Sequence, residues 1–244
     1  MKITLVIPTY NEAENLPILA ERLFSQNVQD LKILIVDDQS PDGCGEVADR
    51  LHEQYGEKFE VIHRKNREGL GKAYIQGIEY ALSQGAEVVG MMDADLSHPP
   101  ERLPEMLKAL ERVDIVIGSR YVEGGSLDDD WPLWRKALSR FANRYTRTIL
   151  RLPIKDTTGG YRVWRREALE AIPFTETKSS GYVFIVELAY LATLAGFKFA
   201  EVPIKFSERQ FGESKMSFRV QFEAAMRVWQ LRRIYRNKVV KSKK

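Results

Sequence analysis

Short apolar runs rich in β-branched residues alternate with helical patterns along the first half of the chain. The apolar runs predict strands at 3–7, 32–36, 60–64, 87–91 and 114–118. The segments between them repeat their apolar residues with helical spacing and predict helices at 14–25, 45–55, 71–84 and 100–111. Strands that are connected through helices usually pair in parallel, and the helices then cover both faces of the sheet. We therefore expect an α/β fold with a mainly parallel sheet and helices on both faces.

The second half of the chain is less regular and completes the same domain. It predicts a Gly/Asp loop at 123–130, a helix at 133–151, a Thr/Gly turn at 156–160, an apolar helix at 182–195 and a strand at 198–207. No linker or repeat separates these segments, so we expect one domain over residues 1–220 and a C-terminal helix and basic tail over 221–244. The longest apolar stretch, 182–197, has 16 residues, fewer than the roughly 18 to 20 that cross a bilayer. We expect no transmembrane segment.

Cysteine content and charge distribution suggest where the protein acts. The chain of 244 residues has one cysteine, Cys44, which cannot form an internal disulfide, and no leader pattern follows Met1. These features predict a reducing, cytoplasmic location. Eight of the 37 basic residues and none of the 34 acidic residues lie between Arg227 and Lys244. A basic end on a mildly acidic body suggests an anionic partner, either a phospholipid surface or nucleic acid, unless that end is simply solvated.

An acidic motif follows the fourth predicted strand, at the sheet edge where ligands of α/β proteins bind. This motif is Asp93-Ala94-Asp95. Two carboxylates at one strand end repel each other unless a cation lies nearby, and Mg²⁺ and Mn²⁺ bind carboxylates together with substrate phosphates. The pair predicts a diphosphate-metal site, although surface aspartates at this spacing are common.

A second acidic motif, Asp37-Asp38, follows the second predicted strand and precedes a turn sequence at 40–43. A carboxylate held by such a turn can accept hydrogen bonds from a nucleobase or a ribose. Asp38 is our candidate for this role. Asp37 is either a second binding group or a turn and capping residue.

Four further polar residues have no assigned role in these motifs. The histidines His52, His63 and His98 are dispersed without metal-ligand spacing, so we expect surface or turn positions for them. Glu187 lies inside the apolar helix at 182–195. It is either a capped polar residue or a site residue that faces the cleft.

The ordered set of motifs resembles the family 2 glycosyltransferases with the GT-A fold, and within them the dolichol-phosphate or polyprenol-phosphate mannosyltransferases. The resemblance covers residues 1–220. The blocks that carry it are Ile7 to Glu12, Val36 to Gly43, Met92 to Pro100, Gly118-Ser119-Arg120-Tyr121 and Gly212-Glu213-Ser214-Lys215. It implies a Rossmann-like GT-A catalytic domain over 1–220.

The resemblance also implies a role for each matching residue. Those implied to line the nucleoside pocket are Pro8, Tyr10, Glu12, Val36 and Asp38. Those implied to lie at the sugar diphosphate and the metal are Asp93, Ala94 and Asp95, and those implied to meet phosphates are Arg120, Arg135, Arg209 and Lys215. Our candidate catalytic residues are Asp95, Arg120, Arg209 and Lys215. Many relatives have a Gln metal ligand where this chain has Ser97, whose shorter side chain would reach a Mg²⁺ or Mn²⁺ ion through water.

Arg209 and Lys215 flank Gly212 in a segment that follows the last predicted strand. A leaving nucleoside diphosphate develops negative charge, which cations in a water-poor site stabilise. We expect this segment to close over bound phosphates and to open for product release.

The predicted helix at 133–151 carries six basic residues and no acid. Its aromatic and aliphatic side chains from Trp134 to Ile149 fall on one stripe, with the cations on a neighbouring face. Such a helix can lie in a membrane interface with its cations on lipid phosphates, or it can pack on a core with a solvated basic face. A lipid monophosphate acceptor suits the first arrangement, since it is a dianionic nucleophile at neutral pH and needs no catalytic base.

The leading hypothesis is an inverting glycosyltransferase that moves mannose from GDP-mannose to a dolichyl or polyprenyl monophosphate, with Mg²⁺ or Mn²⁺, at the cytoplasmic face of a membrane. We expect peripheral attachment to the membrane surface, or attachment through a small membrane subunit. One alternative is a related transferase with another nucleotide sugar, such as UDP-glucose, because fold and motif do not determine the donor. The other is a noncatalytic nucleic-acid-binding protein, which leaves the strand-end acids unexplained because carboxylates repel phosphates.

Overall fold

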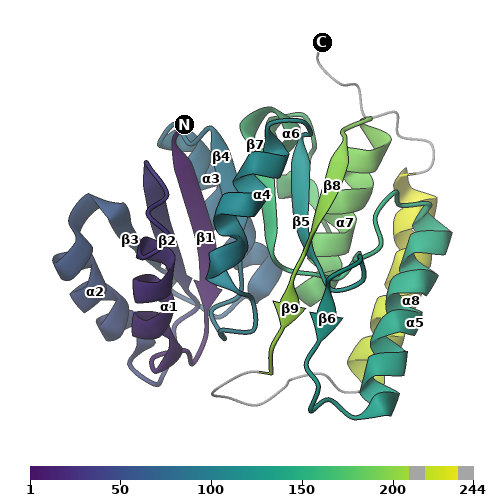
Figure 1. Cartoon of the computed structure of the whole chain (residues 1–244), viewed down its shortest axis with the longest axis horizontal. Helices are drawn as coiled ribbons and strands as arrows, with labels where there is room; N and C mark the ends of the chain where they lie inside the picture. The colour runs from purple at the N-terminus through teal and green to yellow at the C-terminus, as the bar shows by residue number, and fades with distance from the viewer. Residues whose placement is uncertain (209–217, 236–244) are drawn as a thin grey trace.

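Within residues 1–208 and 218–235, the part of the chain that the computed structural model describes, seven strands form a central sheet (Figure 1). Their order across the sheet is β3 (Phe59–His63), β2 (Leu31–Asp37), β1 (Ile3–Thr9), β4 (Val88–Met91), β7 (Arg162–Arg165), β5 (Ile115–Ser119) and β8 (Phe199–Pro203). Neighbouring strands are parallel except where β7 pairs with β4 and β5. The predicted α/β class with a mainly parallel sheet is confirmed.

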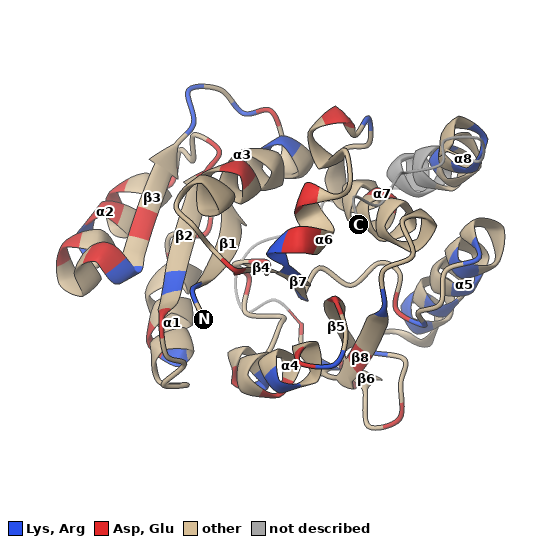
Figure 2. Cartoon of the chain, turned by 90° about the horizontal axis from the view of Figure 1, so that it is seen from above, with Lys and Arg blue, Asp and Glu red and all other residues tan. Residues whose placement is uncertain are grey.

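Helices cover both faces of the sheet (Figure 2). One face carries α1 (Asn15–Phe24), α2 (Cys44–Tyr55) and α4 (Leu103–Leu110), and the other carries α3 (Leu70–Ser83), α6 (Arg166–Glu170) and α7 (Gly181–Leu194). The short 3-10 helices are η1 (Gly56–Lys58), η2 (Pro100–Arg102) and η3 (Phe174–Glu176). Each face has its own apolar core because side chains alternate along a strand, so that Leu5 packs on the first face and Val6 on the second. None of the helices in the described residues has the length and apolar character that crossing a membrane requires.

Two long helices, α5 (Leu133–Leu150) and α8 (Phe218–Tyr235), lie side by side at the β8 end of the sheet (Figures 1 and 2). The Tyr145 hydroxyl on α5 donates to the carbonyl of Ala225 at 3.1 Å, and Arg232 on α8 donates to the carbonyl of Ile149 at 3.0 Å. The predicted boundary at residue 220 falls inside α8. The end of the basic tail, at 236–244, lies outside the described residues.

The apolar stripe of α5 is divided between two environments. Ile149 is buried and Tyr145 contacts α8, so the C-terminal half of the stripe packs against the rest of the protein. Trp134 and Phe141 are 62% and 64% exposed. The N-terminal half of the stripe therefore leaves its aromatic side chains in solvent.

Glu187 is fully buried in α7 and joins this helix to α8. Its carboxylate accepts the backbone N–H groups of Lys178 at 3.3 Å and Ser179 at 2.9 Å, and the hydroxyl of Tyr235 at 2.7 Å. Buried carboxylates persist when hydrogen bonds satisfy them in this way. Of its two predicted roles, Glu187 has the structural one.

The sequence does not predict β7, which enters antiparallel between β4 and β5. Two arginines bracket its short apolar core, so no β-branched run marks it. Arg162 is nevertheless buried and donates to the carbonyls of Thr157 at 2.8 Å, Gly159 at 2.9 Å and Ile185 at 2.9 Å. These backbone acceptors allow an arginine to stand where a strand residue is expected to be apolar.

The predicted continuous strand at 198–207 is wrong. β8 ends at Pro203, and the chain then moves into a second sheet, where β9 (Lys205–Phe206) pairs in parallel with β6 (Ser126–Leu127). Proline has no N–H to continue a ladder, which explains the break at this residue.

Helix α3 packs closely on β1 and β2 through Gly77. A Cβ at this position would collide with the side chain of Val6 and lie 3.0 Å from Val36 Cγ2. We expect Gly77→Ala to lower the free energy of unfolding by about 1 to 3 kcal/mol through overpacking, although alanine has the higher helix propensity. Urea unfolding measures this difference. The matched control is Glu79→Ala, at an exposed position of α3, which should stay within about 0.5 kcal/mol of the wild type; equal stability of the two variants would contradict the packing argument.

Candidate active site

The carboxyl ends of β1, β2, β4 and β5 meet at one edge of the sheet, and backbone strain concentrates there. Three non-glycine residues with left-handed backbone follow strands at this edge, Asn11 (φ 62), Gln39 (φ 57) and Leu96 (φ 61). Strained backbone persists where surrounding contacts hold it, and it is typical of ligand sites. This edge is the candidate active site.

Asp93 and Asp95 lie in the loop that follows β4. Asp95 is buried, and its Oδ1 accepts the Ser97 backbone N–H at 3.1 Å and hydroxyl at 2.5 Å. The Asp93 side chain is 34% exposed and accepts the Tyr74 hydroxyl at 3.4 Å. Burial and the charge of Asp93 raise the pKa of Tyr74, which therefore keeps its proton and remains a donor. Ser97 thus holds the Asp95 carboxylate through hydrogen bonds, while the Asp93 carboxylate is accessible to solvent.

This loop suits a divalent cation whose coordination a diphosphate completes. Residues 1–208 and 218–235 contain no cluster of three or more His, Cys, Asp or Glu side chains that could hold a metal alone. Two carboxylates with phosphate oxygens match the preferences of Mg²⁺ and Mn²⁺. Gly160 faces the same loop, and a Cβ there would lie 3.1 Å from Asp93 Oδ2, so the glycine leaves this carboxylate room. The residues present fit the predicted cation, and a water-mediated contact from Ser97 stays a prediction.

His98 lies in a bend of the loop after β4, but the predicted surface position is wrong. Its side chain is buried between Tyr161 and Phe206, whose ring centroids lie 5.7 and 5.3 Å away. Burial lowers the pKa of His98, and the neutral ring accepts the backbone N–H of Asp93 at Nδ1, at 3.4 Å. His98 therefore supports the loop that contains Asp93 and Asp95, which we call the aspartate loop, from the core side. A histidine without nearby motif residues does not reveal this role in the sequence.

Arg120, directly after β5, is held by a buried ion pair with Asp156. Its Nε and Nη2 each donate to the Asp156 carboxylate at 2.7 Å, and Nη2 also donates to Thr158 Oγ1 at 2.8 Å. Asp156 further accepts the backbone N–H groups of Arg120 and Gly159, each at 2.9 Å. Burial would lower the pKa of Arg120, but the charges of Asp156 and Asp93 outweigh it and raise the pKa. The guanidinium therefore stays charged near the aspartate loop.

The 156–160 turn also joins the candidate active site to α5. Asn143 on α5 accepts the backbone N–H groups of Thr157 at 2.7 Å and Thr158 at 3.2 Å through its Oδ1. At its other end the turn reaches Asp93 through Gly160. The sequence predicts only a Thr/Gly turn here, and its link to Arg120 comes from the fold.

Asp38 anchors a loop at 64–69 that the sequence reading misses. Its carboxylate accepts the Arg64 guanidinium and the backbone N–H groups of Glu68 at 3.2 Å and Gly69 at 2.9 Å. Arg67 in this loop stacks over the Tyr10 ring, with its guanidinium carbon 3.7 Å from the ring centroid. Tyr10 and Asp38, which are both predicted to line the nucleoside pocket, thus contact the same loop. The only sequence signal was the cluster of charges after β3.

Asp37 holds the turn after β2. It accepts the Thr9 hydroxyl at 3.1 Å, and the Ser40 backbone N–H at 3.1 Å and hydroxyl at 2.6 Å. Of the two roles predicted for Asp37, the structure shows that of a turn residue.

The remaining predicted site residues lie in different environments. Pro8, Val36 and Ala94 are buried, which leaves mainly their backbone atoms to meet a ligand. Glu12 accepts the side-chain amide of Asn15 at 2.6 Å. Arg135 on α5 pairs with Glu208 at 2.9 Å and stacks on Trp131, and Glu208 directly precedes Arg209. Arg209 and Lys215 themselves lie outside the described residues.

Solved structures share this architecture. A mannosyltransferase from Pyrobaculum calidifontis, in complex with GDP-Man and Mn²⁺, matches with a TM-score of 0.61 at 19% identity, over 91% of this chain and 60% of that protein. Mannosyl-3-phosphoglycerate synthase from Rubrobacter xylanophilus matches with a TM-score of 0.63 at 20% identity, over 98% of this chain and 75% of that one. The likeness concerns the fold, which is of the GT-A type.

The chain belongs to glycosyl transferase family 2, whose model matches residues 4–172. It is 46% identical over 213 residues to polyprenol monophosphomannose synthase of Mycolicibacterium smegmatis, covering 87% of this chain and 80% of the relative. It is 43% identical over 228 residues to undecaprenyl-phosphate mannosyltransferase of Micrococcus luteus, covering 93% of each chain. The predicted resemblance and the glycosyltransferase class are confirmed, and they argue against a noncatalytic nucleic-acid-binding protein.

The buried pair of Arg120 and Asp156 makes stability depend on pH. Burial would raise the pKa of Asp156, but the charge and hydrogen bonds of Arg120 hold it below the usual value. Such a group stabilises the fold above its unfolded pKa of about 4, and this contribution is lost as pH falls through the lower folded value. We expect Asp156→Asn to cost about 3 to 5 kcal/mol at neutral pH by leaving Arg120 unpaired, and the gap to the wild type to narrow in acid.

Urea unfolding of both proteins at neutral and acid pH checks this expectation. Asp129→Asn is the matched control, because it removes an exposed carboxylate that pairs with Lys205 at 3.6 Å, and it should unfold like the wild type. A cost at Asp156 that does not change with pH would contradict the ion-pair explanation.

Proposed function

We propose that this chain transfers mannose from GDP-mannose, with inversion, to a dolichyl or polyprenyl monophosphate at the cytoplasmic face of a membrane. The observation that carries the proposal is the aspartate loop beside charged Arg120 at the carboxyl edge of a family 2 fold. The names of two relatives, a polyprenol monophosphomannose synthase and an undecaprenyl-phosphate mannosyltransferase, support mannose and a polyprenyl phosphate as substrates.

The donor nucleoside is proposed to bind between Tyr10 and Asp38, beside the 64–69 loop. Tyr10 offers a ring already stacked by Arg67, and Asp38 offers a carboxylate fixed by backbone N–H groups. The Pyrobaculum mannosyltransferase was solved with GDP-Man, which supports guanine. Glucosyl-3-phosphoglycerate synthase from Mycobacterium tuberculosis, a fold neighbour at 16% identity with a TM-score of 0.65, was solved with UDP. UDP-glucose therefore remains the competing donor.

The donor base has a direct test. Titration calorimetry with GDP and UDP in Mn²⁺ should give at least tenfold tighter binding of GDP, because a base pocket that pairs polar edges rejects a mismatched base strongly. Tighter binding of UDP would contradict GDP-mannose as the donor and favour the UDP-sugar alternative.

The transfer itself is an exchange of two C–O bonds at the sugar. An oxygen of the acceptor phosphate forms a bond to the anomeric carbon, and the bond from that carbon to the diphosphate breaks on the opposite face, which inverts the configuration. The electron pair leaves with GDP. Mg²⁺ or Mn²⁺ at Asp93 and Asp95 supplies charge neutralisation for the diphosphate. Arg120 and Arg135 are proposed to stabilise phosphate charge, together with Arg209 and Lys215.

The acceptor phosphate already carries two negative charges near neutral pH, so the chain needs no general base to activate it. The rate of its attack on the sugar then depends on how the phosphate is positioned and not on proton transfer. His98, the one buried histidine in the described residues, serves the aspartate loop.

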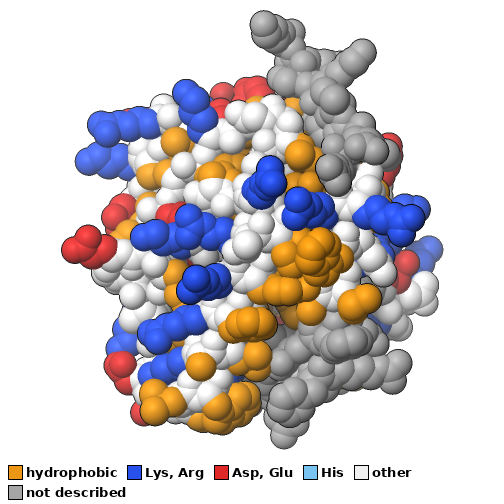
Figure 3. All heavy atoms as spheres, turned by 90° about the vertical axis from the view of Figure 1, so that its right-hand side faces the viewer, with side chains coloured by type: hydrophobic (Ala, Val, Ile, Leu, Met, Phe, Trp, Pro, Cys, Tyr) orange, Lys and Arg blue, Asp and Glu red, His pale blue; other side chains and the backbone are white. Residues whose placement is uncertain are grey.

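Peripheral attachment to a membrane is proposed through α5 and α8. Hydrophobic side chains gather on the face that these helices form, with Lys and Arg side chains beside them (Figure 3). Leu133 is 83% exposed, and Met226 and Trp229 on α8 are half exposed. Exposed aromatic and aliphatic groups flanked by cations are typical of helices that lie in a bilayer interface. A small membrane subunit is the alternative means of attachment.

The metal assignment is tested by Asp95→Asn, which keeps an oxygen for the Ser97 hydroxyl and removes the charge. We expect the variant to lose at least about 10²-fold in kcat, since one lost electrostatic stabiliser of a leaving group has this cost. It should also lose the part of its GDP affinity that depends on Mn²⁺. Transfer assays and GDP titration with and without Mn²⁺ measure both effects.

Asp30→Asn is the matched control, at an exposed position before β2 whose left-handed backbone asparagine also tolerates. It should behave like the wild type in both measurements. Transfer by Asp95→Asn at the wild-type rate would make the metal assignment wrong.

A further inference from the structure

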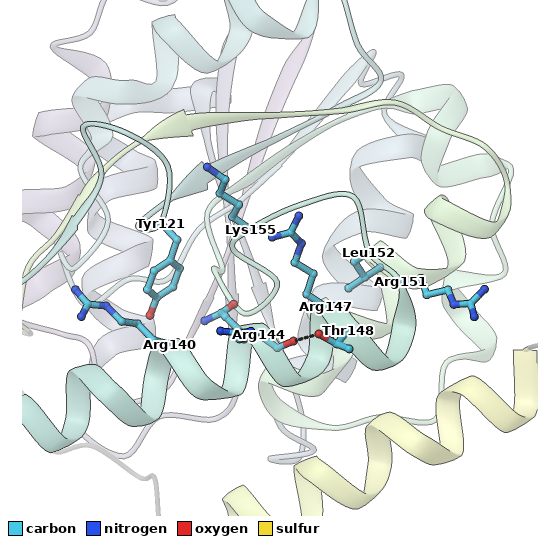
Figure 4. A pocket seen from close by; sticks show the side chains of 9 residues that line it. Tyr121, Arg140, Arg144, Arg147, Thr148, Arg151, Leu152 and Lys155 are labelled. Carbon is cyan, nitrogen blue, oxygen red and sulfur yellow. Dashed lines mark hydrogen bonds between the residues drawn. The ribbon is translucent and has the colours of Figure 1, made fainter.

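A basic pocket of about 690 Å³ lies between α5 and the segment that follows it (Figure 4). Five of its lining residues are cations, Arg140, Arg144, Arg147, Arg151 and Lys155. Arg140, Arg144 and Arg147 rise from α5 on the side of Tyr121 and Lys155, which come from other segments. We call these five cations the basic pocket residues.

The basic pocket residues have no acidic partner in their own stretch of sequence. From 131 through 155 the chain has seven basic and no acidic residues. Arg140, Arg144 and Arg147 recur at helical spacing, which puts like charges on one row of α5, and Arg151 follows directly after the helix ends. Like charges three or four residues apart destabilise a helix. A row that only needed to be solvated would gain stability from a single interposed Glu or Asp, so its uniform charge points to an anionic ligand.

Carboxylates from other segments do not neutralise the pocket. The described residues include no ion pair with any basic pocket residue. The nearby acids are Asp156, which is paired with Arg120, and Glu201. Glu201 accepts the backbone N–H groups of Lys155 at 2.7 Å and Asp156 at 2.8 Å. The pocket therefore has positive charge that an anionic ligand can neutralise.

The pocket and the aspartate loop contact opposite ends of the 156–160 turn. Asn143 lines the pocket and accepts the backbone N–H groups of Thr157 and Thr158. At its other end, Gly160 approaches Asp93. The pocket therefore differs from the aspartate loop in its lining residues, and it lies on the helix whose Leu133, Trp134 and Phe141 are exposed.

We propose that the basic pocket binds the phosphate-bearing head group of an anionic membrane phospholipid. The proposal rests on the membrane attachment in the proposed function and assigns it a specific site. Arginine pairs well with phosphate oxygens because its planar fork donates two parallel hydrogen bonds. The exposed apolar side chains of α5 would enter the acyl boundary while the head group lies among the arginines. These apolar neighbours favour a lipid over a nucleic acid, which would leave them in water.

The test compares two double variants that remove equal charge from the same end of the molecule. Arg144→Gln/Arg147→Gln removes two basic pocket residues. Lys136→Gln/Arg233→Gln removes one cation from α5 and one from α8, both outside the pocket. Binding is measured by co-sedimentation with phosphatidylcholine vesicles that contain about one third phosphatidylglycerol, and with pure phosphatidylcholine vesicles.

A head-group site predicts that the pocket variant loses at least about tenfold more affinity for the anionic vesicles than the control variant, because it loses arginine–phosphate hydrogen bonds in addition to the diffuse attraction of two cations. Equal losses in both variants would mean that diffuse surface charge attracts the membrane, and would overturn the proposal. Equal binding of the wild type to both vesicle types would overturn it as well. Thermal melts and GDP titration accompany each variant, and both should match the wild type because Arg144, Arg147 and Arg233 are exposed and Lys136 is only half-buried.

A second arm separates the phospholipid from the acceptor lipid as the source of the phosphate. Transfer is assayed in detergent micelles that contain polyprenyl phosphate and no phospholipid. A raised KM for polyprenyl phosphate in the pocket variant, with its vesicle binding unchanged, would assign the pocket to the acceptor and overturn the proposal. The wild-type chain in the same micelles tests the proposed function by itself: absence of mannosyl transfer there, with pocket-dependent vesicle binding intact, would reject the function and retain the lipid site.

Discussion

The buried ion pair between Arg120 and Asp156 is the interaction on which the geometry of the candidate active site depends. Taking two charges out of water is costly, and the cost is offset only when hydrogen bonds satisfy the groups completely. Here the Asp156 carboxylate accepts bonds from the Arg120 side chain and from two backbone N–H groups. Because the same turn reaches Asp93 and Asn143, one pair positions the aspartate loop, the end of β5 and α5 relative to one another.

The 156–160 turn separates two surfaces of different chemistry. On one side lies an edge with carboxylates and fixed cations, suited to a water-soluble nucleoside diphosphate sugar. On the other side lie the basic pocket and the exposed apolar side chains of α5, suited to a bilayer surface. The proposed transfer from a soluble donor to a lipid acceptor requires a surface of each kind on one molecule. A short turn between them meets this need without a membrane-spanning helix in the described residues.

Local pattern was enough to predict most of the fold. The first five predicted strands match β1 to β5 within two residues at each end, because β-branched runs between turn residues form strands in almost any context. The aspartate motifs were found because parallel strands bring their carboxyl ends together. The prediction failed at β7, where two arginines, one of them buried, bracket a short apolar core, and at His98, whose burial depends on Tyr161 and Phe206 from later strands and loops.

The sequence by itself determined the α/β alternation, the acidic strand ends and the acid-free basic helix, since these are properties of composition and spacing along a continuous segment. Only the tertiary structure decided which charges pair. Arg120 meets Asp156 across 36 residues, Arg64 meets Asp38 across 26, and Tyr235 meets Glu187 across 48. Such partners are chosen by strand order and helix packing, which place distant segments in contact, and no local pattern along the chain contains that information.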